Sequence, residues 1–192
     1  MPRAALVLAG GRGRRLGGAR KVTLDIAGRT PLDRVLAACA DWPPVVVGPA
    51  DLPLPAGVRL VTDDPPFGGP VSGLRTGLAA LAPETDLVAV LAADQPFVTG
   101  AALERLAEAV GGGEGAAYVA DGVVAFLCAV WRAPALRARV AAAGSSMRSV
   151  YADATVTRVE DLAGVTLDVD TAADLDHARA RASQPTTRSN PE

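Results

Sequence analysis

The chain alternates short apolar runs with amphipathic segments, and this alternation narrows the folds that it can adopt. The clearest run, Leu87-Val88-Ala89-Val90-Leu91-Ala92, has no polar alternation, as expected of a strand in a sheet covered on both faces. Similar runs lie at residues 4–8, 45–47, 58–62, 117–119, 123–130 and 155–159, and helical patterns at 31–40, 70–81, 99–110, 133–143 and 171–181. The sequence therefore predicts an α/β fold with a mostly parallel sheet that binds ligands at the carboxyl ends of its strands.

The length of the chain predicts one domain. With 192 residues and 49% hydrophobic content, the chain is long enough for one substantial core, but two cores would be crowded. We expect the domain to span residues 1–182. Residues 183–192 lack apolar anchors and are expected to form a disordered tail. Within the domain, residues 133–158 carry more helix than strand signals and are expected to form a smaller lobe over an acceptor site.

Charge and cysteine content exclude several classes of protein. The net charge of −2 leaves no broadly basic surface, which argues against a nucleic-acid partner. No apolar run is long enough to cross a bilayer or to complete a signal peptide, so we expect a soluble, cytoplasmic protein with no membrane partner. Cys39, Cys128 and the single His177 can supply neither a disulfide framework nor a zinc site, and both thiols are expected to be buried.

A glycine- and arginine-rich segment follows the first predicted strand, at residues 8–21. Its five glycines allow backbone amides to approach an anion, and four arginines and Lys21 supply positive charge. Lys21 is the only lysine among 19 basic residues, which suggests a position that needs a compact ammonium group. The segment has neither the Gly-Lys-Ser/Thr of a Walker A loop nor the spacing of a dinucleotide fingerprint. We interpret it as a triphosphate-binding loop.

Leu8-Ala9-Gly10-Gly11, Arg15-Leu16-Gly17-Gly18 and Lys21 together resemble the signature of the molybdenum cofactor guanylyltransferase (MobA-like) family of nucleotidyltransferases. The resemblance implies a single Rossmann-like three-layer α/β/α domain of the nucleotide-diphospho-sugar transferase type. It also implies that Leu8, Ala9 and Gly10 line the base and ribose, and that Arg15 and Lys21 hold phosphates during transfer. Gly11 favours guanine, because cytidylyl relatives tend to have alanine at that position.

Asp94 follows the run 87–92 directly, where a carboxylate would emerge at the ligand-binding edge of the sheet. The segment Ala93-Asp94-Gln95-Pro96-Phe97 resembles the family segment whose aspartate binds the metal. Mg²⁺ suits such a site, because it takes one or two carboxylates and bridges phosphate oxygens of the substrate. An alternative is that Asp94 only caps a turn. We expect Asp94 to contact both the metal and the nucleotide.

Asp168 and Asp170 precede the last helical pattern, and their alternation places them on the same side of an extended segment. By resemblance to the family's late Asn-x-Asn-Thr segment, Asp170 is a candidate second metal contact, while Asp168 orients the site. Capping of the last helix by Asp170 or Thr171 is an equal and compatible interpretation.

Asp63 and Asp64 lie in a segment that resembles the one in which the family carries an aspartate before Gly-Pro-Leu-x-Gly. A carboxylate there can accept hydrogen bonds from guanine N1–H and the 2-amino group, a donor pair that adenine and cytosine lack. Alignment favours Asp63 as the base contact, and Asp64 is the alternative. A second alternative is that both residues only form a turn before Pro65.

The resemblance implies an enzyme that transfers GMP from GTP to the terminal phosphate of molybdopterin or the molybdenum cofactor and releases pyrophosphate, with Mg²⁺ as cofactor. Molybdoenzymes or cofactor-delivery proteins are its expected protein partners. Two alternatives stay open. One is a relative with another base or acceptor, such as a cytidylyltransferase or a sugar-phosphate nucleotidyltransferase, and the other is a non-catalytic cofactor-binding protein.

Overall fold

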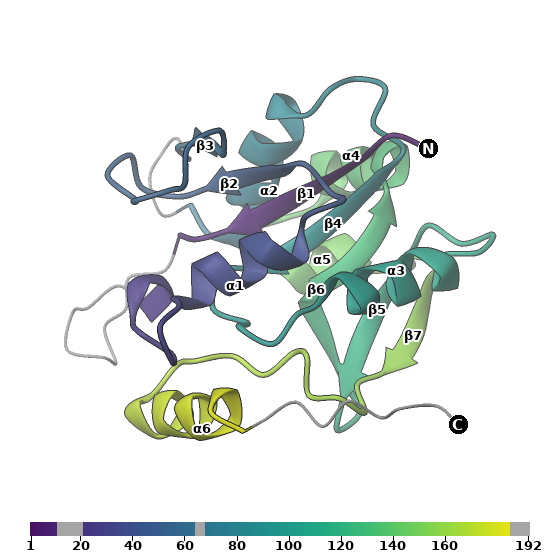
Figure 1. Ribbon diagram of the computed structural model, residues 1–192. Coiled ribbons are helices and arrows are strands. Elements are labelled where there is room, and N and C mark those ends of the chain that lie inside the picture. Colours follow the sequence, from purple (N-terminus) through teal and green to yellow (C-terminus); the bar gives the residue numbers. More distant parts are fainter. Residues whose placement is uncertain (11–20, 64–67, 185–192) are drawn as a thin grey trace.

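A computed structural model describes residues 1–10, 21–63 and 68–184, and places a seven-stranded sheet at the centre of the molecule (Figure 1). The strands are β1 (Arg3–Leu8), β2 (Pro44–Val47), β3 (Arg59–Val61), β4 (Leu87–Ala92), β5 (Gly115–Ala120), β6 (Val123–Arg132) and β7 (Val156–Glu160). The helices are α1 (Pro31–Ala38), α2 (Pro70–Ala80), α3 (Gly100–Ala109), α4 (Ala133–Ala142), α5 (Met147–Tyr151) and α6 (Ala172–Ala182), with a 3-10 turn η2 (Lys21–Thr23).

The sheet has the order β3-β2-β1-β4-β6-β5-β7 and is mostly parallel, as the sequence predicts. β1 pairs in parallel with both β2 and β4, while β6 is antiparallel to its neighbours β4 and β5. The reversal comes from a hairpin between β5 and β6, whose turn residues Asp121 and Gly122 have φ values of 50° and 77°. Such angles are typical of a two-residue turn that matches the twist of the strands.

Helices cover both faces of the sheet, which gives the expected three-layer α/β/α arrangement. Along β1, Ala5 and Val7 point into a cluster with α1 and α3, whereas Ala4 and Leu6 point into a cluster with α2, α4 and α5. Because both faces are buried, every residue of β4 is buried, which explains its continuous apolar sequence.

Capping residues fix where two of these helices begin. Thr30 accepts a hydrogen bond from the Asp33 backbone N–H, and the Asp33 carboxylate accepts one from the Thr30 backbone N–H. Thr171 and Asp174 form the same reciprocal capping box at α6. Thr171 is therefore the N-cap of the last helix, so the cap does not occupy the neighbouring Asp170 side chain.

Residues 133–158 do not form a separate lobe, and that expectation is wrong. α4 and α5 pack on the central sheet through Leu136, Met147 and Val150, and β7 pairs with β5 in the same sheet. The apolar face of this region is buried against the sheet, so the region belongs to the main core.

The C-terminal helix α6 packs against the segment that follows η2 rather than on the main sheet (Figure 1). Ile26, Val169, Leu175 and Ala178 form a small buried cluster there. Both cysteines are buried and free, as expected. Within the part of the chain that the structure describes, no helix has the length and apolar character needed to cross a membrane. The boundary at residue 182 stays a prediction, because residues 185–192 lie outside the described part.

Candidate active site

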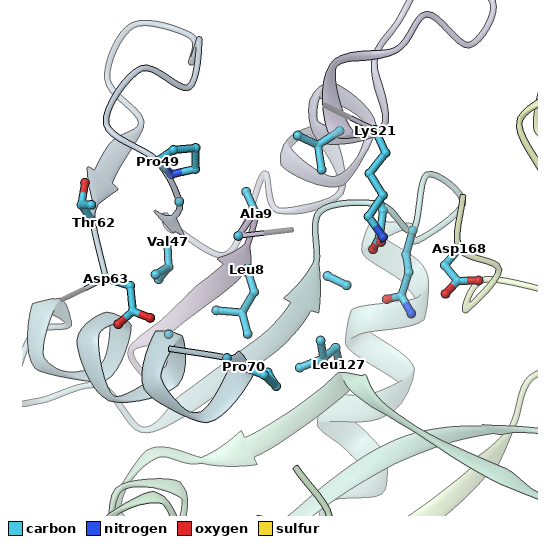
Figure 2. A pocket seen from close by; sticks show the side chains of 18 residues that line it. Leu8, Ala9, Lys21, Val47, Pro49, Thr62, Asp63, Pro70, Leu127 and Asp168 are labelled. Carbon is cyan, nitrogen blue, oxygen red and sulfur yellow. The ribbon is translucent and has the colours of Figure 1, made fainter. Parts of the chain in front are cut away.

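A cavity of about 360 Å³ opens where the carboxyl ends of β1, β2, β3 and β4 meet (Figure 2). The chain continues from β1 to β2 on one side of the sheet and returns in β4 on the other side of β1, so this edge is a topological switch point, where α/β sheets bind ligands. The lining residues are Leu8, Ala9, Gly10, Lys21, Val22, Val47, Gly48, Pro49, Thr62, Asp63, Gly69, Pro70, Gly73, Ala92, Asp94, Gln95, Leu127 and Asp168.

The end of β1 is held on both sides by backbone hydrogen bonds. The Ala9 N–H donates to the Val47 carbonyl at 2.8 Å, and the Leu8 carbonyl accepts from the Ala93 N–H at 3.0 Å. Leu8, Ala9 and Gly10 line the cavity, as the sequence predicts for base and ribose contacts. The candidates Gly11 and Arg15 lie outside the described residues.

At one end of the cavity, Lys21, Asp94, Asp168 and Asp170 form what we call the lysine–carboxylate cluster. The Lys21 Nζ forms ion pairs with Asp94 Oδ2 and with Asp170 Oδ1, the latter at 2.6 Å. The side chains of Lys21 and Asp94 are 19% and 12% exposed, so their ion pair is largely shielded from solvent. Lys21 comes from η2, Asp94 from the end of β4 and Asp170 from the segment before α6. The sequence predicts each of these residues as functional, and the structure brings them together.

The electrostatics of the cluster follow from its composition. Burial acts to lower the pKa of the Lys21 ammonium, but hydrogen bonds to Asp170 and Asp94 outweigh it and the pKa is raised. The pKa of Asp168 is raised by partial burial and by the like charges of Asp170 and Asp94. Asp168 is exposed by its accessible surface, so we attribute only a small energetic effect to this shift. One ammonium and three carboxylates leave a formal excess of two negative charges.

The donor set of the cluster fits a hard divalent cation. Asp94 and Asp170 offer carboxylate oxygens, the ligands that Mg²⁺ prefers, and the excess negative charge attracts a cation. Among the described residues, no three or more Asp, Glu, His or Cys side chains are grouped so that they could hold a metal ion. Mg²⁺ commonly takes only one or two carboxylates from a protein and completes its coordination with waters and substrate phosphates.

At the other end of the cavity, Asp63 follows β3 and is held by two hydroxyl groups from α2, an arrangement that we call the Asp63 clamp. Ser72 Oγ donates to Asp63 Oδ1 at 2.8 Å, and Thr76 Oγ1 donates to the same oxygen at 3.0 Å. Figure 2 shows Asp63 near Val47 and well separated from Lys21. The alternative base contact, Asp64, lies outside the described residues.

Three contributions to the site were not predicted from the sequence. Ser72 and Thr76 belong to a helical pattern that was recognised, and their spacing of one turn is the signal that could have placed both on one face. Gln95 lines the cavity and is 7% exposed. Its Nε2 donates to the Thr166 carbonyl at 3.2 Å, and its buried Oε1 has no partner among the described residues.

The domain has three layers and a cavity at the switch point beside its first and fourth strands. The Lys21 ammonium follows the first strand and the Asp94 carboxylate follows the fourth. This is the architecture of a nucleotide-binding α/β transferase. Residues 5–159 match the family of the MobA-like NTP transferase domain, and the chain belongs to that family. The resemblance seen in the opening motif is thereby confirmed.

Curated relatives are about one third identical to the chain over the regions that match. It is 34% identical over 129 residues to a probable molybdenum cofactor guanylyltransferase of Methanosarcina acetivorans, a match that covers 59% of this chain and 56% of the relative. It is 36% identical over 139 residues to the molybdenum cofactor guanylyltransferase of Cereibacter sphaeroides, covering 66% of this chain and 67% of the relative. The matched region thus spans between about half and two thirds of the length of these relatives.

A solved structure supports the fold. The manganese complex of Rv0371C from Mycobacterium tuberculosis superposes with a TM-score of 0.73 and 20% identity, covering 94% of this chain and 99% of that one. At this level of identity, the similarity establishes the common fold alone.

Proposed function

We propose that the chain transfers GMP from GTP to the terminal phosphate of molybdopterin or the molybdenum cofactor and releases pyrophosphate. The observation that carries the proposal is the pairing of Lys21 with Asp94 and Asp170 at one end of a cavity that has Asp63 at the other. The first group of residues suits a triphosphate with its cation, and the second suits a base with hydrogen-bond donors. Two guanylyltransferases among the relatives support this substrate assignment.

The reaction needs little acid–base catalysis. An oxygen of the acceptor phosphate attacks the α-phosphorus of GTP, a new P–O bond forms, and the bond to the oxygen that bridges the α- and β-phosphorus atoms breaks. Pyrophosphate takes that electron pair. A phosphate monoester is already anionic at neutral pH, so no proton has to be removed from the nucleophile. The protein therefore acts by positioning the two phosphates and by neutralising charge.

Each end of the cavity has a role in this scheme. Lys21 exchanges its carboxylate partners for phosphate oxygens of the bound nucleotide and stabilises the charge that develops on them. Arg15 is proposed as a second phosphate contact, by resemblance to the family. Leu8, Ala9 and Gly10 line the ribose and base, and Gly11 is proposed as a further nucleotide contact by resemblance to the family. Asp63 accepts hydrogen bonds from the guanine edge.

We propose Asp94 and Asp170 as the residues that hold Mg²⁺. When bound there, the cation supplies neutralisation of the phosphate charge and a template for the leaving pyrophosphate. Two carboxylates with room for phosphate oxygens match the preference of Mg²⁺ for few protein ligands. A protein of the same fold has been solved with manganese, which supports a divalent metal in this architecture.

The test is pyrophosphate release with molybdopterin and Mg²⁺, measured separately with GTP, CTP, ATP and UTP. We expect release with GTP, and its loss in Lys21→Met and Asp94→Asn. Glu108→Gln is the matched control for a carboxylate-to-amide change, because Glu108 is exposed on α3, away from the cavity. This control is expected to retain full activity.

Other results of the same assay would select the alternatives. Release with CTP and none with GTP would replace the base assignment. Molybdopterin binding without pyrophosphate release from any nucleotide would favour a non-catalytic carrier. The proposed setting is the cytoplasm, with molybdoenzymes or cofactor-delivery proteins as recipients of the product, and a pull-down with those proteins tests this part.

A further inference from the structure

The Asp63 clamp distributes hydrogen bonds unequally between the two carboxylate oxygens. Both hydroxyl donors, Ser72 and Thr76, donate to Oδ1. A carboxylate has about four acceptor positions, two on each oxygen, so these bonds occupy the capacity of Oδ1. Among the described residues, neither hydroxyl contacts Oδ2, which leaves that oxygen for a ligand in the cavity.

The helix that carries the two hydroxyls is itself held closely against the sheet. A Cβ atom added to Gly77 would lie 2.9 Å from Leu6 Cδ2 and 3.0 Å from Val47 Cγ2, so the backbone of α2 approaches β1 and β2 through this glycine. Val71 and Leu74 of the same helix are fully buried. Because α2 cannot shift toward the sheet, the helix holds Ser72 and Thr76 at fixed positions beside Asp63.

The segment at Gly68, just before α2, also lies close to the Asp63 clamp. A Cβ atom added to Gly68 would lie 2.6 Å from Ser72 Oγ and 3.2 Å from Asp63 Oδ2. There is therefore no room for a side chain at position 68 beside Ser72.

We propose that Ser72 and Thr76 are positioning residues that set base selectivity by turning Asp63 Oδ2 toward the N1–H and 2-amino donors of guanine. This inference rests on the proposed function, in which Asp63 contacts the base. The ligand class is a purine nucleotide with a hydrogen on N1. Adenine has an acceptor at N1, so a fixed carboxylate oxygen repels it, whereas a freely rotating carboxylate could turn away and tolerate it.

The test is equilibrium binding of GTP, ITP and ATP in the presence of Mg²⁺, measured by calorimetry without any acceptor. ITP keeps the N1–H and lacks the 2-amino group, and ATP lacks both donors. In the Ser72→Ala/Thr76→Val variant, GTP affinity is expected to fall about tenfold, while ATP affinity is expected not to fall, because the released carboxylate can turn away from adenine. Thr76→Ser keeps the hydroxyl and is expected to bind all three nucleotides like the parent chain.

Two outcomes would overturn the inference, and they differ in what else they overturn. Equal losses for GTP, ITP and ATP in the double variant would make the hydroxyls merely structural. Unchanged nucleotide preference in Asp63→Asn would remove the base contact itself, and the clamp role with it. The binding assay uses no acceptor, so its result does not depend on GMP transfer. A failure of the transfer reaction can therefore be distinguished from a failure of this inference.

Discussion

The two ends of the cavity differ in the interactions that hold their carboxylates. The lysine–carboxylate cluster joins residues far apart in the chain, because Lys21 and Asp170 are separated by 149 positions, and its contacts are ionic. The Asp63 clamp joins residues 9 and 13 positions apart through neutral hydroxyl donors. Ion pairs are exchanged when a charged ligand arrives, whereas hydroxyl donors keep a carboxylate in place. The comparison therefore predicts a phosphate end that rearranges on binding and a base end that is already organised.

The largest effect is expected from Asp94→Asn. Removing one negative charge from the proposed metal contact weakens the binding of the cation and therefore the neutralisation of phosphate charge. GMP transfer should fall about 10³-fold. Pyrophosphate release under saturating GTP measures it, with Glu108→Gln as the control. Retention of more than a tenth of the activity would remove Asp94 from the metal site.

Lys21→Met tests whether the Lys21 ammonium competes with the metal cation for Asp94 and Asp170 before nucleotide binds. Transfer should fall about 10²-fold, because phosphate charge loses a partner. At the same time Mn²⁺ alone, titrated by electron paramagnetic resonance without nucleotide, should bind at least about tenfold more tightly, since Asp94 and Asp170 no longer share Lys21. Weaker Mn²⁺ binding in this variant would show that Lys21 supports the metal rather than competes with it.

Gly77→Ala tests whether the base end depends on the close contact of α2 with the sheet. The added methyl group must displace Leu6 or Val47, which costs about 1–3 kcal/mol and is partly offset by the better helix propensity of alanine, about 1 kcal/mol. Thermal unfolding is expected to shift downward by about 2–6 °C. GTP selectivity over ATP should fall, while Mn²⁺ affinity stays unchanged, because the cluster lies on other elements.

The smallest effect is expected from Asp168→Asn. The folded chain raises the pKa of Asp168, so the ionised carboxylate opposes folding, and this cost appears as pH rises from the ordinary range of an aspartate through the raised pKa. At pH 7 the amide should therefore raise the melting temperature slightly, by about 1–2 °C, since Asp168 is exposed and screened. The difference should vanish near pH 3, where the carboxyl group is protonated in both states. A lower melting temperature at pH 7 would contradict this reasoning.

Sequence patterns locate most of the fold because the strands are short and apolar and most of the helices have a recognisable start. All seven predicted strands occur, including β4 at residues 87–92. The direction of β6 was not predicted, because orientation depends on the Asp121-Gly122 turn and not on the apolar content of the strand. α5 was missed because five residues carry too little periodicity for a helix to be recognised.

The site was predictable where residues must meet a charged ligand. Lys21, Asp94 and Asp170 were each identified from motifs, but their mutual pairing depends on the packing of α6 beside η2, which no local pattern encodes. Ser72 and Thr76 were missed for a related reason, since hydroxyl groups on a helix are ordinarily solvated. Only the spatial approach of β3 to α2 gives them a partner in Asp63.

The placement of α6 also has a consequence for the order of events during synthesis. Lys21 is made before Asp170, and at about 5–20 residues per second the ribosome needs roughly 7–30 s to make the 149 positions between them. Once β4 has been made, the growing chain contains the strands on both sides of β1 but not yet Asp170. Nucleotide bound to the nascent chain before Asp170 is made would meet an incomplete set of partners, so the site becomes complete only after Asp170 has been added.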